Sequence, residues 1–200
     1  MSKMANRHLT VAGLATVALI VVGCGHARSV DASLSPQVGL IATSEVPSQP
    51  AQVKLIGDRD VEVTLTGPIA AKYLSATQSQ KDALGKPLTG DRNAGARESG
   101  AVFQQFEGGV IIAENGDVGT PGYITWGKIR EAWNVQRNAD GLPEITGENG
   151  SVGPLGVPTS DENADGDLLV TTFQHGKIEY NSKTGQVEVT VNGKVVPSGL

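Results

Sequence analysis

Oxygen-bearing side chains at alternate positions suggest a cation site in the second half of the chain. Asp161, Asn163 and Asp165 are followed by Gly166, which matches the first half of an EF-hand calcium loop. That loop ends on a bidentate glutamate, and Thr172 stands at the corresponding position. The pattern is therefore incomplete for calcium. We predict an acidic surface turn with no metal and no other cofactor, and weak calcium binding at the surface is the alternative.

Residues suited to nucleophilic or glycosidic catalysis are sparse. A nucleophilic enzyme needs a base oriented beside the nucleophile, and the histidines beyond residue 23 are His26 and His175. A zinc site needs several His or Cys ligands, and Cys24 is the only cysteine. Carboxylates such as Glu114 and Asp117 lie in turn-rich sequence, where they usually cap turns or face water. We therefore predict no catalytic residues and a function that is not enzymatic.

Two copies of one series of motifs must position these residues. Each copy has a Gly-x-Ile-x-x-x-aromatic stretch, an LGxP turn and a Phe-x-x-Gly-x-Ile stretch, in that order. The turns contain Leu84, Gly85 and Pro87 in the first copy, and Leu155, Gly156 and Pro158 in the second. Matching motifs are 60 residues apart at the first stretch and 71 apart at the turn. The difference predicts an insertion in the second copy, within residues 138–151.

Each motif predicts a local structure. Isoleucine and an aromatic residue four positions apart share one helix face. In the turn, glycine adopts unusual φ values, leucine fills the core and proline prevents a helix. The stretches 100–112 and 168–180 predict β-hairpins. The fold class is therefore α+β, with two tandem repeats over about 62–121 and 122–191, each a short helix, a Gly/Pro turn and a β-hairpin.

The ends of this array need a cover, because two repeats are fewer than such arrays usually need to bury their faces. Residues 62–65 and 187–191 alternate in polarity like strands. These strands could cap the array. The alternative is that the domain pairs with itself or with another protein.

The motifs resemble the LGFP repeat family of actinobacterial exported proteins. Lys86 and Val157 replace the aromatic residue of the name motif, and no third helix motif follows Gly185. The resemblance implies a non-catalytic module of cell-envelope proteins that tethers them to the cell wall. It carries no catalytic residues.

Two aromatic residues are candidates for ligand binding because aromatic faces stack on sugar rings. Trp133 repeats the position of Tyr73, which predicts a core role for both. Tyr123 and Trp126 have no aromatic counterpart in the first copy, where Thr66 precedes the helix motif. We predict ligand binding at Tyr123 and Trp126, with core packing as the alternative.

The N-terminus is typical of bacterial export. Lys3 and Arg7 precede an apolar run over residues 9–23, which is too short for a comfortable membrane span. Gly23-Cys24 resembles the cleavage and lipidation site of a lipoprotein, whereas an ordinary signal peptide would leave the cysteine incidental. We expect residues 1–23 to be a signal peptide, 24–54 a lipidated, disordered tether and 55–200 the repeat domain.

Charge narrows the expected partners. The chain carries −5, and removal of residues 1–23 takes away two basic residues and no acidic ones, leaving −7. Nucleic-acid binding rests on clustered Lys and Arg, so we exclude it. We expect an exported protein, lipid-anchored to the outer face of the cell membrane, that binds cell-wall polysaccharide. The alternative is an accessory protein that contacts an envelope enzyme, and an unrecognised hydrolase would need a polar pocket that the sequence does not reveal.

Overall fold

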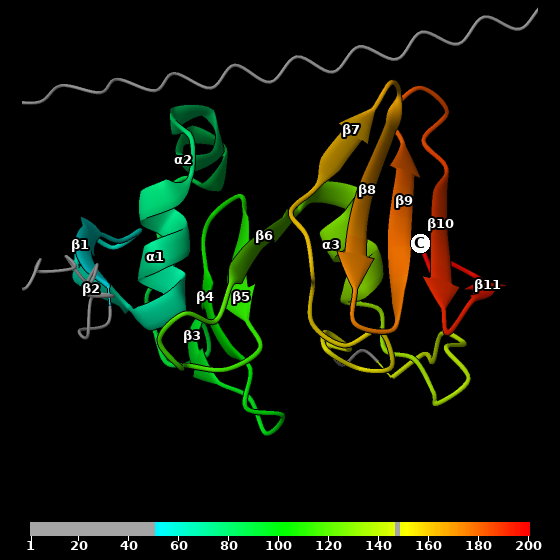
Figure 1. Ribbon diagram of the computed structural model, residues 1–200, viewed down its shortest axis with the longest axis horizontal. Helices are drawn as coiled ribbons and strands as arrows, with labels where there is room; N and C mark the ends of the chain where they lie inside the picture. The colour runs from blue at the N-terminus through cyan, green and yellow to red at the C-terminus, as the bar shows by residue number, and fades with distance from the viewer. Residues whose placement is uncertain (1–50, 147–148) are drawn as a thin grey trace, which may run out of the picture. The chain divides into compact units, whose positions relative to one another are not determined.

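The computed structural model describes residues 51–146 and 149–200, all within one compact unit of the chain (Figure 1). The predicted cleavage and lipidation site at Gly23 and Cys24 lies outside the described residues. The first strand begins at Gln52. Residues 52–54 therefore belong to a strand and not to the tether, which we had expected to end at residue 54.

Three helices and eleven strands lie within the described ranges. The helices are α1 (Gly67–Ser75), α2 (Gln78–Leu84) and α3 (Gly127–Trp133). The strands are β1 (Gln52–Ile56), β2 (Glu62–Thr66), β3 (Ala94–Ala96), β4 (Val102–Gln105), β5 (Gly109–Ala113), β6 (Gly122–Trp126), β7 (Asn163–Asp165), β8 (Leu168–Phe173), β9 (Gly176–Asn181), β10 (Val187–Val191) and β11 (Lys194–Val196). The α+β class is confirmed.

The strands form three antiparallel sheets. We call them the first sheet (β1-β2), the middle sheet (β3-β4-β5-β6) and the last sheet (β7-β8-β9-β10-β11). The predicted hairpins are β4–β5 and β8–β9. Each hairpin is extended on both sides, so that β3 to β6 and β7 to β10 follow the same meander.

The predicted repeat unit is only partly correct. The first copy has a second helix, α2, that we did not predict. Its start is fixed by a capping box, in which the Thr77 hydroxyl accepts from the Gln80 backbone and the Gln80 side chain accepts from the Thr77 backbone. In the second copy the described residues between α3 and Leu155 contain isolated bridges and no helix. This is the region of the predicted insertion.

Two hydrophobic clusters lie on opposite faces of the middle sheet. Ile111 and Ile124 belong to the cluster that includes Leu65 and Ile69, between this sheet, α1 and the first sheet. Val110 and Ile112 belong to the cluster of α3 and the last sheet. Because side chains alternate along a strand, β5 is buried at all five positions.

Strands lie at both ends of the array, where we expected caps. The hairpin β1–β2 packs on α1. At the other end, β10 is followed by β11 and not by another helix (Figure 1). The outward positions of the last sheet include Lys177 and Glu179, which form an ion pair of 2.7 Å. A polar outer face is what the end of a repeat array requires.

Candidate functional site

The two LGxP turns are built alike and serve the core. Leu84 is 0% exposed and Leu155 is 2% exposed. Gly85 and Gly156 have φ values of 70° and 76°, in the region that glycine tolerates best. In both turns, leucine is thus buried in the core and glycine adopts a left-handed conformation.

A side chain from the following hairpin closes each turn. Glu107 Oε2 accepts a hydrogen bond from the Lys86 backbone at 3.0 Å. Gln174 Oε1 accepts the corresponding bond from Val157 at 3.1 Å. The third position of the motif thus contributes its backbone N–H to the turn, which any residue except proline can do. This explains why Lys86 and Val157 are compatible with the fold.

The helix aromatics pack on the hairpin phenylalanines. Tyr73 stacks on Phe106 with ring centroids 5.8 Å apart, and Trp133 lies 5.7 Å from Phe173. Trp133 is 3% exposed, and its indole Nε1 donates to the Gly156 carbonyl at 3.1 Å. The predicted core role of Trp133 is confirmed, and Tyr73 is half-buried.

Tyr123 and Trp126 do not form one surface. They are three positions apart in β6, so their side chains leave opposite faces of the sheet. Trp126 is partly buried against the cluster that contains Ile124, whereas Tyr123 is half-buried on the other face. A ligand-binding role for either residue stays a prediction, and the two cannot contact one sugar ring together.

Asp161 connects the two copies. One carboxylate oxygen pairs with the Lys72 ammonium group of α1, and the other accepts from the Ile124 backbone at 2.8 Å. Asn163 and Asp165 lie in the exposed strand β7. Within the described part of the chain, no group of three His, Cys, Asp or Glu side chains could hold a metal ion. The Asp161 carboxylate is therefore already paired with a cation of the chain.

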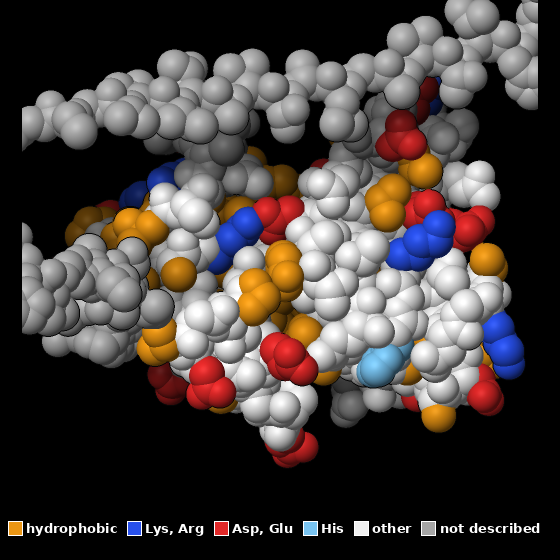
Figure 2. All heavy atoms as spheres, in the orientation of Figure 1, with side chains coloured by type: hydrophobic (Ala, Val, Ile, Leu, Met, Phe, Trp, Pro, Cys, Tyr) orange, Lys and Arg blue, Asp and Glu red, His pale blue; other side chains and the backbone are white. Residues whose placement is uncertain are grey.

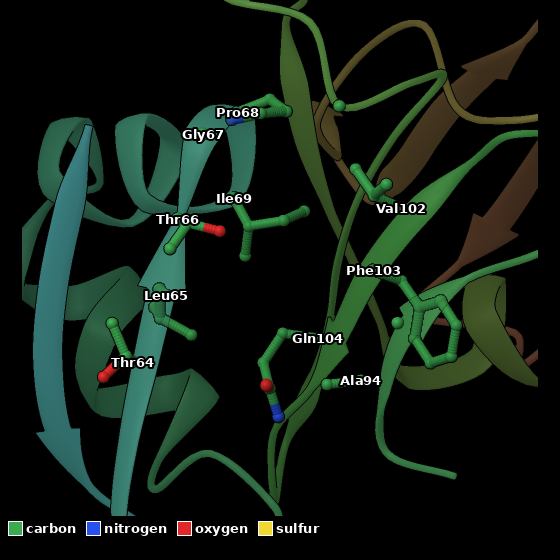
Figure 3. A pocket seen from close by; sticks show the side chains of 12 residues that line it. Thr64, Leu65, Thr66, Gly67, Pro68, Ile69, Ala94, Val102, Phe103 and Gln104 are labelled. Atoms are coloured by element: carbon green, nitrogen blue, oxygen red, sulfur yellow. The ribbon is translucent and has the colours of Figure 1, made fainter. Parts of the chain in front are cut away.

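A cavity of about 220 Å³ lies between the first and middle sheets (Figure 3). Thr64, Leu65 and Ile69 line one side, and Ala94 and Gln104 line the other. Figure 3 shows Phe103 directed to the opposite side of β4. Threonine and glutamine side chains beside apolar ones can hydrogen-bond the hydroxyl groups of a sugar.

Two partly buried arginines meet at a second, smaller pocket on the other face of the middle sheet. Arg97 and Arg130 both line it. Burial lowers the pKa of each guanidinium group, because removal from water disfavours the charged form. This pair could not be predicted from the sequence, because the two arginines are 33 positions apart and no local motif links them.

A family model for the LGFP repeat matches residues 84–141 and 155–195. The chain belongs to the LGFP-repeat family. Each matched LGFP segment begins at the leucine of an LGxP turn. The first segment contains the middle sheet and α3, and the second contains the last sheet.

No curated protein matches the sequence. Among the LGFP protein's described residues, no helix is long and apolar enough to span a membrane. On the face shown in Figure 2, charged side chains of both signs are scattered among polar ones.

Proposed function

We propose that this protein is a non-catalytic, lipid-anchored component of the cell envelope whose repeat domain binds cell-wall polymer, either peptidoglycan or arabinogalactan. The match of two LGFP segments carries the proposal, because the resemblance implies wall tethering. The tandem helix, turn and hairpin units would act together, since α3 of the first matched segment contacts strands of the second.

The cavity between the first and middle sheets supports a carbohydrate ligand. Its lining combines the polar residues Thr64, Thr66 and Gln104 with the apolar residues Leu65 and Ile69. Sugar rings present hydroxyl groups at their edges and C–H groups on their faces, so a mixed lining suits them. The half-exposed Tyr123 ring is a separate candidate contact.

Sedimentation with purified wall tests the proposal. Residues 25–200 would be mixed with delipidated, protein-free cell wall and centrifuged. We expect the protein in the pellet, together with an established wall-binding domain as the positive control. Recovery of the protein only in the supernatant, while the control sediments, contradicts wall binding.

The lipid anchor has its own test. Cys24→Ala should move the full-length protein from the membrane fraction to the soluble fraction, because only cysteine can carry the thioether-linked lipid. Ser29→Ala, a substitution in the expected tether, is the control. Persistence of Cys24→Ala in the membrane fraction would place the anchor elsewhere.

A second candidate function is contact with an envelope protein. Leu142 is 46% exposed, and Ile145 and Leu200 are also exposed. The insertion meets the C-terminal segment, since a side chain at Gly199 would lie 3.3 Å from Pro143. Exposed apolar residues on adjoining segments favour a protein partner. Sedimentation with wall that keeps its bound proteins and with wall stripped of them distinguishes the two functions. Only binding to the polymer itself persists when the wall proteins have been removed.

A further inference from the structure

The pocket between Arg97 and Arg130 has the chemistry of a small anion site. Arg97 follows β3, and Arg130 lies in α3. The polar residues that share the lining are Gln105, Asn134, Asn149 and Ser151. We call these six residues the arginine slot. Among the described residues, its lining contains no acidic side chain, although acidic residues outnumber basic ones in the chain.

Neither arginine has a carboxylate partner within residues 51–146 and 149–200. Arg97 lies over the Phe103 ring, with its guanidinium carbon 4.8 Å from the ring centroid. Arg130 Nη2 donates to Gln105 Oε1 at 3.0 Å. The Nε atoms of both arginines are buried without a hydrogen-bond acceptor in this part of the chain. Donors of this kind are costly to bury unless an acceptor reaches them.

Arg137, whose Nε also has no acceptor among the described residues, differs from Arg97 and Arg130 at its terminal nitrogens. It is 7% exposed, and its two terminal nitrogens donate to four backbone carbonyls, those of Ala132, Gly141, Pro197 and Ser198. Arg97 and Arg130 have no comparable set of acceptors among the described residues. Apart from the Arg130 bond to Gln105, their donors have no acceptor in the described part of the chain and are available to an external group.

The repeat architecture does not require these arginines. Arg130 is the third residue after Gly127 in α3, and Ala70 holds that position after Gly67 in α1. The strand pairings place Arg97 opposite Ala101, where the second copy has Asp165 opposite Leu168. At each of these two positions, one copy therefore has an arginine where the other copy has an acidic residue or an alanine.

A third donor lies in the same lining. Ser151 is 8% exposed, and its hydroxyl oxygen has no hydrogen-bond partner in the described chain. The Ser151 backbone is held by Asn149, whose Oδ1 accepts from the Ser151 N–H at 2.8 Å. Ser151 lines the slot together with the arginines, and its hydroxyl group is available to an acceptor.

We propose that the arginine slot binds a carboxylate group of the ligand, with Arg97 and Arg130 as charged donors and Ser151 as a neutral donor. The slot has a volume of only about 10 Å³, so it admits one anion oxygen and no sugar ring. A flat carboxylate brings less bulk to the mouth of the slot than a tetrahedral phosphate does. The planar guanidinium fork matches carboxylate geometry. The inference rests on the proposed function for the source of the ligand, which would be a carboxylate-bearing part of the wall polymer.

Titration with free anions tests the slot without any wall material. The Nε–Hε signals of Arg97 and Arg130 would be followed by NMR at constant ionic strength, with acetate, glucuronate, inorganic phosphate and chloride as probes. We expect saturable shifts of both signals with acetate and glucuronate, and at least tenfold weaker binding of phosphate and chloride. Equal responses to all four anions, or none, would overturn the proposal and leave a water-sized structural gap.

Substitutions assign the effect to the slot. Arg97→Gln and Arg130→Gln should each weaken glucuronate binding at least tenfold, and the lysine variants should be intermediate because they keep the charge and lose the fork. Arg92→Gln removes the same charge at an exposed position shortly before β3 and should leave the affinity for glucuronate unchanged. For the glutamine variants, whose own signal is lost, the remaining arginine reports binding and circular dichroism reports folding. If Arg92→Gln weakens binding as strongly as the slot variants, the carboxylate is attracted by net charge and the proposal is wrong.

Wall sedimentation of the Arg97→Gln/Arg130→Gln variant separates this inference from the proposed function. Loss of sedimentation with retained folding supports both. Failure of the unsubstituted protein to sediment contradicts wall binding alone, because the anion titration decides the slot independently.

Discussion

The middle and last sheets share one strand order and one register, yet they have opposite surroundings. In β5, Val110 and Ile112 face α3 and the last sheet. The pairings Ile111↔Ile124 and Ile178↔Val189 align β5 with β9, so that Lys177 and Glu179 occupy the positions of Val110 and Ile112. One sheet is a buried layer, and the other ends the array.

Alternate residues of these strands have separate roles. Inward residues pack on a helix, and outward residues depend on whether a further layer covers the sheet. The inward positions, such as Ile111 and Ile178, are apolar and 0% exposed in both sheets, because each sheet covers a helix. The outward positions differ, since only the middle sheet has a further layer on that side. A repeat can therefore be made internal or terminal by changing outward residues while its inward ones are kept.

The segments after the two LGxP turns are also held differently. In the first copy, Asp58 from the loop between β1 and β2 accepts from the Thr89 backbone at 2.8 Å and from its hydroxyl at 2.7 Å. In the second copy, the segment supplies its own acid, Asp161, to Lys72 of the first copy. The β1–β2 hairpin thus holds the segment after the first turn, whereas the first copy holds the corresponding segment of the second copy.

Exchange of outward residues between the two sheets should give the largest effect. Ile112→Glu places a carboxylate at a position that is 1% exposed and should cost more than about 4 kcal/mol of unfolding free energy. Glu179→Ile, the reciprocal change, should alter it by less than about 1 kcal/mol, because replacing an ion pair by an apolar group is often nearly neutral. Urea unfolding measures both, and equal losses would show that the sheets are not distinguished by their outward neighbours.

Truncation of the helix aromatics should give the next largest difference. Trp133→Ala leaves a cavity in the core and should cost about 3–5 kcal/mol. Tyr73→Ala should cost about 2 kcal/mol, since Tyr73 is half-buried and, among the described residues, its hydroxyl group makes no hydrogen bond like the one from the Trp133 indole to Gly156. Thermal unfolding of the two variants checks the order. A greater loss for Tyr73→Ala would contradict the view that Trp133 is the better buried of the two aromatic residues.

Removal of the Asp161 charge should loosen the contact between copies. Asp161→Asn leaves Lys72, whose side chain is 15% exposed, without its counter-ion and should cost about 1–2 kcal/mol. Glu62→Gln, which breaks the exposed Lys54–Glu62 pair of 2.8 Å, is the control and should cost less than about 0.5 kcal/mol. Hydrogen exchange at Ile124 should accelerate in Asp161→Asn only. Unchanged exchange would mean that the carboxylate does not protect this amide.

The smallest effect should come from Asp58 and should depend on pH. Hydrogen bonds from the Thr89 side chain and backbone lower the pKa of Asp58. Because the folded pKa lies below the unfolded one, its contribution to stability is present above the unfolded pKa and is lost as pH falls through the folded pKa. The difference in Tm between the unsubstituted protein and Asp58→Asn should therefore be visible at pH 7 and vanish in acid. A difference that grows in acid contradicts the assignment.

Local elements could be predicted because their causes are local. Alternation predicted β10, and the hairpins at 100–112 and 168–180 followed from glycine between apolar runs. The helix α2 was missed although Thr77 and Gln80 have the spacing of a capping box. The short edge strands β3 and β7 could not have been found, since three exposed residues carry no periodic signal.

The chain alone therefore determines the repeated turns, the helices that follow glycine, the hairpins and the core aromatics, all of which depend on neighbours within a few residues. The chain also determines where the array ends, because the outward residues of β9 are polar. Only the tertiary structure decides that Asp161 meets Lys72, 89 positions away, and that Arg97 and Arg130 line one pocket. Contacts of this kind depend on which face of one sheet is covered by the next layer, and no local pattern of residues encodes them.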